Sequence, residues 1–347
     1  MRAAKYLGPF VYLLSIPLLY ATAVAAPFLA PIGILASLVV ATQMKRDVAN
    51  NASSDAFRLL PIVYIPLQLT VTLWGAHEAS RADALGFASL AVSIGVCTGV
   101  FGVLAAHEMV HSRESWHRLL GALMLTGMTY RHFRIAHIYG HHRHAATERD
   151  ASTARLGESF YAFLPRTLWQ QLAESYGFEQ HRLRCGKRFD VRNRVIQDVA
   201  LMILVYGGLT LLWGWRSALF LAVESVVGIV VLELFNYVAH YGLVRRVHDG
   251  QLEPFRDHHS WNSSGLGNFL IFNMGRHSHH HREPAISYED LRRAPAPELP
   301  AGYAGSIVLA LVPPLWHALM DQRARAFNLG FAGAQYADSA ESVSTAP

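Results

Sequence analysis

The chain has little cysteine and little charge. Two of its 347 residues are cysteines, Cys97 and Cys185, and no Cys-x-x-Cys pair occurs. Two cysteines are too few for a disulfide framework, a zinc ribbon or a fused iron–sulfur electron carrier. Charged residues make up 16% of the chain and hydrophobic residues 52%. The charged share is well below the roughly 25% typical of soluble domains, so this composition favours a membrane protein.

Long runs without charge dominate the first half and recur after residue 195. A helix needs about 20 predominantly apolar residues to cross a bilayer. A soluble core of buried helices is the alternative, but so many uncharged runs would need a very large core to cover them. A cleaved signal peptide is not expected, because the first run is long and continues into a second. We expect six spans, at about 6–26, 28–44, 59–76, 85–106, 197–215 and 218–240.

Basic residues set the expected orientation of these spans. The loop at 77–83 carries only Arg81, whereas the amino terminus and the loop between the second and third spans are basic. Basic loops face the cytoplasm, so we expect His107 to emerge on the cytoplasmic side of an integral, bacterial-type inner membrane protein. The basic residues of the amino terminus and of that loop are Arg2, Lys5, Lys45, Arg46 and Arg58. The net charge of +5 indicates a face apposed to membrane lipids, and no nucleic-acid motif accompanies it.

The remaining chain is polar and interrupts the spans twice. We expect one all-α membrane domain at 1–330, with a cytosolic histidine-rich cap built from 107–195 and 241–300. The apolar piece Leu119 to Thr129 is too short to span. Ala304 to Met320 is broken by Pro313 and Pro314, which favours a peripheral helix. The Ala- and Ser-rich tail at 331–347 is predicted to be disordered.

Four histidines fall within the stretch Arg276 to Arg282. Imidazole nitrogen suits iron, zinc, copper and nickel. On a helix, His277, His280 and His281 share one face, whereas His279 points elsewhere. An exposed histidine run or an expression tag is the alternative. Because the run follows an apolar segment in the interior of the chain, a metal-binding role is favoured.

Histidines with similar spacing occur at three further places. His107 and His111 are four residues apart, His137 to His142 repeats that spacing with one adjacent histidine, and His240 ends an apolar run. These four places supply nine imidazoles, more than the four ligands of one tetrahedral zinc site. The pattern therefore predicts two metal ions with four or five nitrogens each, at the cytoplasmic ends of membrane helices.

Two polar residues precede His240 on one helical face. Glu233 and Asn236 lie seven and four residues before it, within an apolar run. They could orient histidine ligands by hydrogen bonds, or they could form polar contacts between membrane helices.

Acidic residues also follow the second histidine group. Glu148 and Asp150 could accept ring N–H groups of ligating histidines, or form exposed pairs with Arg149 or Arg155. Four histidines lie near these motifs but lack the recurring spacing, so the sequence does not assign them a role as ligands: His144, His258, His259 and His279. Histidines that stand alone are expected to be ordinary: His77, His117, His132, His181, His248 and His317.

These motifs together resemble the membrane alkane 1-monooxygenase family, which includes alkane hydroxylases and xylene monooxygenases, within the fatty acid desaturase–hydroxylase superfamily. The resemblance covers roughly residues 5–295. The stretches that carry it are His107–His111, His137–His142 with the tail through Asp150 and Arg155, Gly157–Tyr161 with Leu164–Arg166, Leu232–Leu243, Ser260–Ser263 and Arg276–His281.

The resemblance implies a six-helix membrane domain with a cytosolic cap, two non-haem iron ions and O₂ as oxidant. It implies electrons from a rubredoxin or ferredoxin-type donor with its reductase, and an apolar hydrocarbon substrate hydroxylated at its terminal carbon. A desaturase or decarboxylase with the same site is the alternative outcome. Carried over position by position, the implied ligands are His107, His111, His137, His141, His142, His240, His277, His280 and His281.

Three positions depart from the family pattern. Ala136, Ala239 and His279 stand where an acid is usual, so three carboxylates beside the metals are lost. The residues expected to support the ligands are Glu108, Asp150, Glu233, Asn236 and His279, and no catalytic side chain is expected beyond the metal centre.

Two other classes of function fit the sequence less well. A histidine-rich metal transporter would place its ligands near the bilayer midplane, whereas these histidines lie at the expected cytoplasmic boundary. A non-catalytic membrane scaffold with vestigial motifs is disfavoured because the histidine groups are intact.

Overall fold

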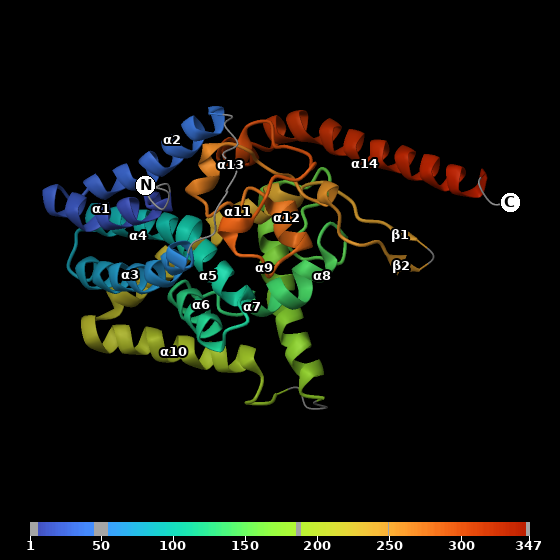
Figure 1. Cartoon of the computed structure of the whole chain (residues 1–347). Helices are drawn as coiled ribbons and strands as arrows, with labels where there is room; N and C mark the ends of the chain where they lie inside the picture. Colours follow the sequence, from blue (N-terminus) through green and yellow to red (C-terminus); the bar gives the residue numbers. More distant parts are fainter. Residues whose placement is uncertain (1–5, 45–54, 185–188, 249, 345–347) are drawn as a thin grey trace.

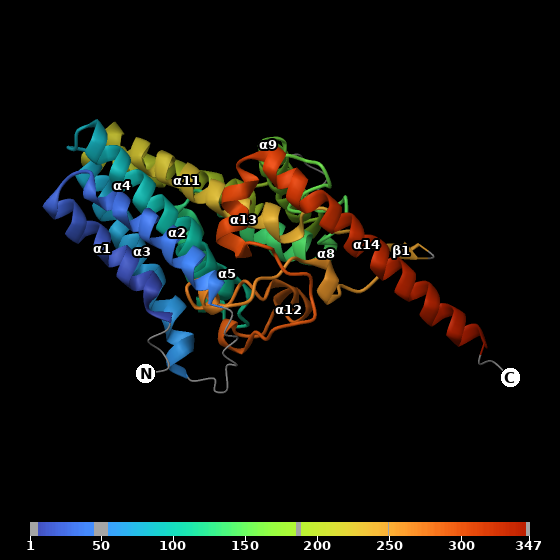
Figure 2. The same ribbon diagram turned by 90° about the horizontal axis from the view of Figure 1, so that it is seen from above.

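The computed structural model describes residues 6–44, 55–184, 189–248 and 250–344, and nearly all of the regular structure in these ranges is helical. Apolar helices lie side by side in both views, and α12 (His277–Arg282) lies near the middle of the molecule (Figures 1 and 2). The helix α14 (Pro313–Ser344) and the hairpin of β1 (Val247–His248) and β2 (Gln251–Leu252) extend from the side opposite the apolar helices (Figures 1 and 2). Cys185 and the basic residues Arg2, Lys5, Lys45 and Arg46 lie outside the described residues.

The apolar half consists of helices joined by short connections. Its elements are α1 (Gly8–Thr22), η2 (Ala26–Phe28), α2 (Leu29–Gln43), α3 (Asp55–Ala79), α4 (Ala84–Cys97), the π-helix η3 (Thr98–Gly102), α5 (Val103–His111), α10 (Arg194–Trp213) and α11 (Trp215–His240).

Within the described residues, four continuous helices are long and apolar enough to cross a membrane, judged by length and composition: Phe57–Ala79, Ala84–His111, Arg194–Trp213 and Trp215–His240. This confirms the four corresponding predicted spans in length and character. At the first two predicted positions the apolar helices are shorter, Gly8–Thr22 and Ala26–Ala41. These features are those of an integral membrane protein.

Local sequence explains where several of these helices begin. The Asp83 carboxylate accepts a hydrogen bond from the Gly86 N–H (2.7 Å) and caps α4. Asn193 caps α10 by accepting from the Val195 N–H (2.9 Å). Such side chains satisfy N–H groups that the first turn of a helix leaves unpaired. A single residue, Gly214, separates α10 from α11, and its φ of 86° lies in the left-handed region that glycine adopts without strain.

Glycines allow the two helices that end in predicted ligands to pack closely. A Cβ atom on Gly99 would lie 2.7 Å from the Gly228 carbonyl oxygen, and one on Gly95 would lie 2.8 Å from the Glu224 carbonyl oxygen. Small residues let membrane helices approach to backbone contact. The close packing of α11 against the helix Ala84–His111 brings His240 to the same end of the bundle as His107.

The polar half is built mostly from short helices around a second apolar core that includes Phe163, Tyr237 and Trp261. Its elements are α6 (Ser115–Gly127), α7 (Phe133–Ile135), the π-helix η4 (Ala136–His141), α8 (His142–His144), α9 (Phe160–Arg182), β1 (Val247–His248), β2 (Gln251–Leu252), η5 (Asp257–His259), η6 (Leu266–Phe269), α12 (His277–Arg282), η7 (Tyr288–Asp290), α13 (Gly302–Ala310) and α14 (Pro313–Ser344). β1 and β2 are antiparallel, with Val247 opposite Leu252.

The carboxyl-terminal segment agrees with the sequence in one respect and differs in another. α13 ends and α14 begins at the expected proline break. However, α14 continues to Ser344, into the tail predicted to be disordered. Alanine is the best helix former and no proline interrupts this stretch, so local propensity favours continuing the helix. The last three residues lie outside those described.

Candidate metal centre

The nine histidines implied as ligands gather in two groups in the middle of the molecule. One ring nitrogen from each member of a group lies within 4.8 Å of those of the other members. The five-His group is His107, His111, His137, His142 and His280, and the four-His group is His141, His240, His277 and His281. All nine side chains are buried or partly buried, so the alternative of an exposed histidine run is wrong for α12.

The helix α12 contributes to both groups, which the shared-face prediction did not anticipate. His277 and His281 belong to the four-His group and His280 to the five-His group. At about 100° per residue, His280 and His281 point roughly 100° apart around the helix axis. Because α12 lies between the groups, this angle directs the two rings to different groups.

A π-helix changes the spacing in the second histidine motif. The sequence suggested a pair four residues apart, His137 with His141, but His137 groups with His142 instead. Ala136–His141 is a π-helix, in which hydrogen bonds join residues five apart. His137 and His142 are therefore one turn apart, and their Nε2 atoms are 3.0 Å from each other. His141 is left to face the other group.

The nitrogen positions fit metal coordination better than hydrogen bonding. His137 Nε2 lies 3.0 Å from the Nε2 atoms of both His111 and His142. A neutral ring nitrogen carries either one hydrogen or one lone pair, so it cannot bond both neighbours. His107 is buried, and neither of its ring nitrogens has a hydrogen-bond partner among the described residues. Two nitrogens about 2.1 Å from one ion, at right angles, lie about 3.0 Å apart, so the side chains fit a bound metal in each group.

The protonation state of the rings supports this fit. Burial, and then repulsion between neighbouring imidazoles, lowers the pKa of five ligand candidates outside the apolar helices well below the ordinary value. These residues are His137, His142, His277, His280 and His281. At neutral pH the rings are uncharged and have lone pairs available to a metal ion.

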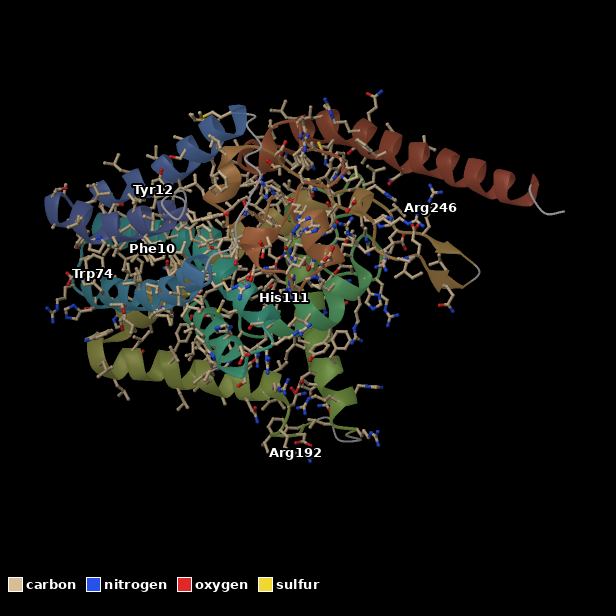
Figure 3. The ribbon with its side chains drawn as sticks, viewed as in Figure 1. Phe10, Tyr12, Trp74, His111, Arg192 and Arg246 are labelled. Carbon is tan, nitrogen blue, oxygen red and sulfur yellow. The ribbon has the colours of Figure 1, made fainter. Side chains whose placement is uncertain are left out.

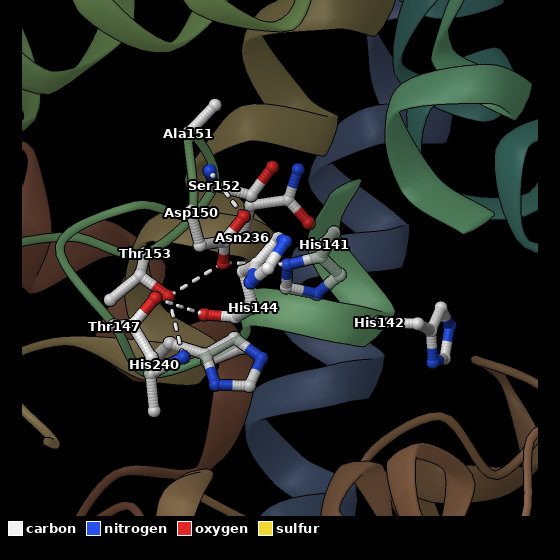
Figure 4. A network of polar contacts seen from close by, with 12 residues as sticks. His141, His142, His144, Thr147, Asp150, Ala151, Ser152, Thr153, Asn236 and His240 are labelled. Carbon is white, nitrogen blue, oxygen red and sulfur yellow. Dashed lines mark hydrogen bonds and ion pairs between the residues drawn. The ribbon is translucent and has the colours of Figure 1, made fainter. Parts of the chain in front are cut away.

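Two rings of the four-His group are held by hydrogen bonds from their outer nitrogens. His141 Nδ1–H donates to the Asp150 carboxylate (2.8 Å), and His240 Nδ1–H donates to the His259 carbonyl oxygen (2.9 Å). Figure 4 shows the Asp150 network. Burial alone would raise the pKa of Asp150, but the adjacent His141 ring and the Thr153 hydroxyl hold it below its ordinary value. Both bonds leave the inner Nε2 lone pair free for a metal.

The sequence left two roles open for the acidic residues Glu148 and Asp150, a hydrogen bond to a ligating histidine or an exposed ion pair. The structure places Asp150 beside a ligand candidate. Asp150 is buried and bonds His141, whereas Glu148 is exposed. No ion pair joins Arg149 or Arg155 to either acid within the described chain.

The side chains of the other supporting candidates make no hydrogen bond to a histidine of either group among the described residues. Glu233 accepts hydrogen bonds from Tyr130 (3.0 Å) and Gln171 (2.9 Å), and Asn236 donates to it (3.1 Å). These bonds join α9, α11 and the segment before α7, as polar contacts between helices would. The Glu108 carboxylate accepts a long hydrogen bond from the Tyr288 N–H (3.4 Å) and one from the Ser287 side chain.

His279 lies outside both groups. Its Nδ1 accepts from the Arg292 N–H (3.2 Å), and its Nε2 lies 3.6 Å from the Glu283 carboxylate. The histidines at 77, 117, 132, 181 and 317, which were expected to be ordinary, are also outside both groups, as are His144, His258 and His259. The side chain of His248 lies outside the described part of the chain.

Sequence patterns missed two kinds of support. The His259 carbonyl acts through the backbone, which no side-chain motif reveals. Phenylalanine rings pack against ligand candidates: Phe133 stacks on His137 (5.0 Å between ring centres) and Phe255 on His281 (4.8 Å). Their apolar character gave no signal that distinguished them from other core residues.

An apolar cavity of about 70 Å³ lies between the apolar helices beside the four-His group. Phe235 lines it and contacts the His277 ring edge-on (5.5 Å), while stacking on Tyr303 (4.3 Å, 7° between planes). The lining is formed by Leu38, Gly99, Val100, Val103, Leu104, Val231, Leu232, Phe235, Ile271, Tyr303, Ala304 and Ile307. The cavity therefore suits an uncharged, apolar ligand.

Comparison with known protein families defines the class of protein. A family model described as fatty acid desaturase matches residues 84–308, well over half of the chain. The matched region contains all nine histidines and three of the four long apolar helices. Fold, site and match together are those of a helical membrane protein of the desaturase superfamily with a histidine-rich metal site.

Individual relatives narrow this class. Alkane 1-monooxygenase 2 of Pseudomonas aeruginosa is 38% identical over 299 residues, covering 84% of this chain and 78% of the relative. Alkane 1-monooxygenase of Acinetobacter baylyi is 34% identical, covering 82% of this chain and 73% of the relative. The hydroxylase component of xylene/toluene monooxygenase of Pseudomonas putida is 28% identical, with 74% and 71% covered. The chain belongs to the alkane 1-monooxygenase family, which confirms the resemblance of its motifs.

Proposed function

We propose that this protein is a membrane monooxygenase that hydroxylates an apolar hydrocarbon, such as an alkane or alkyl chain, at its terminal carbon. The balanced reaction is R–H + O₂ + 2 e⁻ + 2 H⁺ → R–OH + H₂O. The observation that carries the proposal is a pair of buried imidazole groups with an apolar cavity beside one of them, where Phe235 lines the cavity and contacts His277. The relatives' names, which specify alkane and xylene/toluene monooxygenases, support this reaction over others.

The bound metals are proposed to be two iron ions, one in each histidine group. When bound, they supply the oxidising power that no side chain has. The nine histidines would hold them through neutral nitrogens, and Asp150 would orient His141 while adding negative charge to the four-His group. The surrounding burial excludes water, and Phe235 separates the cavity from His277.

The membrane arrangement is part of the same proposal. Six spans, at the ranges expected from the sequence, would carry a cap formed by 107–195 and 241–300, in one domain over 1–330. The histidine groups would face the cytoplasm of a bacterial-type inner membrane. A rubredoxin or ferredoxin-type donor with its reductase would supply the electrons from that side.

Desaturation remains the second candidate, because the matching family model is described as fatty acid desaturase. Hydroxylation and desaturation use the same oxidant and differ in the fate of the substrate, so the product separates them.

Product analysis tests the proposal. Purified protein would receive a reductant, ¹⁸O₂ and a panel of alkanes, alkylbenzenes, terpenes and fatty acids, with mass spectrometry of the products. We expect an alcohol that carries one ¹⁸O atom and no product from the variant His280→Ala. An alkene product without ¹⁸O would show that the reaction is desaturation and not hydroxylation. Elemental analysis of protein purified without added metal should find close to two irons per chain, and one zinc without iron would overturn the proposed metal centre.

A further inference from the structure

A basic groove of about 930 Å³ lies on the surface behind the four-His group. It is formed by two segments that are distant in sequence, the loop after α8 and the loop after α11 with the first residue of β1, together with one residue of α14. The lining residues are Ala146, Thr147, Glu148, Arg149, Thr153, Ala154, Arg155, Leu156, Gly242, Leu243, Val244, Arg245, Arg246, Val247 and Asn328.

The groove is strongly positive. Four arginines and one glutamate line it, which gives 4 − 1 = +3, against a net charge of +5 for the whole chain. Arg149 and Arg155 are exposed, and no ion pair joins either of them to a carboxylate within the described residues. The guanidinium groups of Arg245 and Arg246 donate to the backbone carbonyls of Glu253 and Asn328, and no ion pair joins either of them to a carboxylate within the described residues.

Exposed apolar side chains lie among these arginines. Leu156, Val244 and Val247 are 38%, 52% and 64% exposed. Arginine beside apolar groups is typical of protein–protein interfaces, whereas a site for a small anion alone would need no such surface.

The floor of the groove is connected to a predicted metal ligand. Thr153 lines the groove, and its hydroxyl donates to the Asp150 carboxylate (2.7 Å), which in turn accepts from His141 Nδ1–H (2.8 Å). Two hydrogen bonds therefore link the groove to the ring of His141 (Figure 4). A protein docked in the groove would lie close to the four-His group.

Arg246, which lines the groove, lies far from several residues of the apolar half. In Figure 3, Arg246 lies on the opposite side of His111 from Phe10, Tyr12 and Trp74, which belong to the apolar half. This position places the groove away from lipid and favours a soluble protein over anionic headgroups as its occupant.

We propose that this groove docks an acidic electron-carrier protein, which delivers electrons to the metal site through the side of His141. The proposal rests on the proposed function, because that reaction consumes two electrons per product. A one-electron carrier must therefore dock twice in its reduced form and leave twice oxidised. The two cysteines in these 347 residues cannot form an iron–sulfur group of their own. The proposed carrier therefore docks from outside these residues, and its carboxylates pair with Arg149 and Arg155.

Binding measurements test the docking site directly. The detergent-solubilised protein would be titrated with an acidic rubredoxin at low and high salt, with a basic cytochrome c as the negative control. The groove variant is Arg149→Gln with Arg155→Gln. The matched control is Arg81→Gln with Arg118→Gln, which removes the same charge from exposed arginines outside the groove.

We expect the groove variant to bind rubredoxin roughly 3- to 30-fold more weakly at low salt, because each exposed ion pair contributes modestly. The control variant should bind like the unmodified protein, and added salt should erase the difference by screening. With a saturating chemical reductant in place of the carrier, the groove variant should form product at the unmodified rate.

Three results would overturn the docking site. They are equal rubredoxin affinity in both variants, tight binding of cytochrome c, and loss of binding to anionic phospholipid vesicles without loss of rubredoxin binding. The last would make lipid headgroups the occupant. Failure of the proposed function is distinguishable, since it would appear as absence of product with every reductant while the affinity difference between variants persists.

Discussion

Replacing Asp150 by asparagine should weaken metal binding in the four-His group and spare the five-His group. Asp150 Oδ2 accepts from both His141 Nδ1–H (2.8 Å) and the Thr153 hydroxyl (2.7 Å), while Oδ1 accepts from the Ser152 N–H (3.1 Å). An asparagine side chain can keep its oxygen at the Oδ2 position only by turning its NH₂ group toward another donor, the Ser152 N–H. The substitution also removes the negative charge that makes His141 a stronger ligand.

Two estimates of the magnitude agree. A hydrogen bond to a charged group contributes about 1.5–3 kcal/mol. Loss of a partner that orients a ligand typically costs about 10–100-fold in metal affinity, or about 1.4–2.7 kcal/mol. We therefore expect one of two bound metals to be lost at a chelator concentration roughly 10–100-fold lower than in the unmodified protein.

Chelator competition with elemental analysis measures this loss. Asp198→Asn is the matched control, because Asp198 is a buried carboxylate that pairs with Arg131 and Arg134 rather than with a histidine. The control should lower thermal stability and leave the chelator curve unchanged. Equal loss of both metals in Asp150→Asn, or the same loss in the control, would refute the assignment of Asp150 to the four-His group.

Three further predictions address other parts of the site. His280→Ala should remove the metal of the five-His group and abolish turnover, whereas His317→Ala should keep both metals; equal loss in the two variants would indicate general destabilisation. His279→Asp should retain full metal occupancy, measured by elemental analysis, because His279 lies outside both groups, and loss of one metal would make it a ligand. Phe235→Leu should shift product formation toward longer hydrocarbons because it enlarges the cavity, and Ala304→Leu should shift it toward shorter ones because it fills the same cavity. Competition between substrates of different chain length measures both shifts, and each methylene contributes about 1–3 kcal/mol. If both variants shifted the preferred chain length in the same direction, the result would contradict a role for this cavity.

The two halves of the fold differed in how well the sequence predicted them. The four long apolar helices were found at their expected positions because length and lack of charge are properties of each segment alone. The first two helices are shorter than predicted and the tail is helical to Ser344. Helix ends depend on caps and neighbouring contacts, and composition alone did not separate a helical Ala-rich tail from a disordered one.

The sequence by itself determined the set of candidate metal ligands. It supplies nine histidines at four places, which are enough for two metals, and too few cysteines for sulfur ligation. Only the tertiary structure decided how those histidines divide into groups of five and four, since the π-helix at Ala136–His141 and the position of α12 set which rings meet. It likewise selected Asp150, rather than Glu148, to hold His141, and formed the basic groove from two distant loops. The physical reason is the range of the contacts in sequence. Spacing along a helix fixes which residues are neighbours within a few positions. A coordination site or a groove depends on contacts between distant segments, which the chain brings together only when it folds.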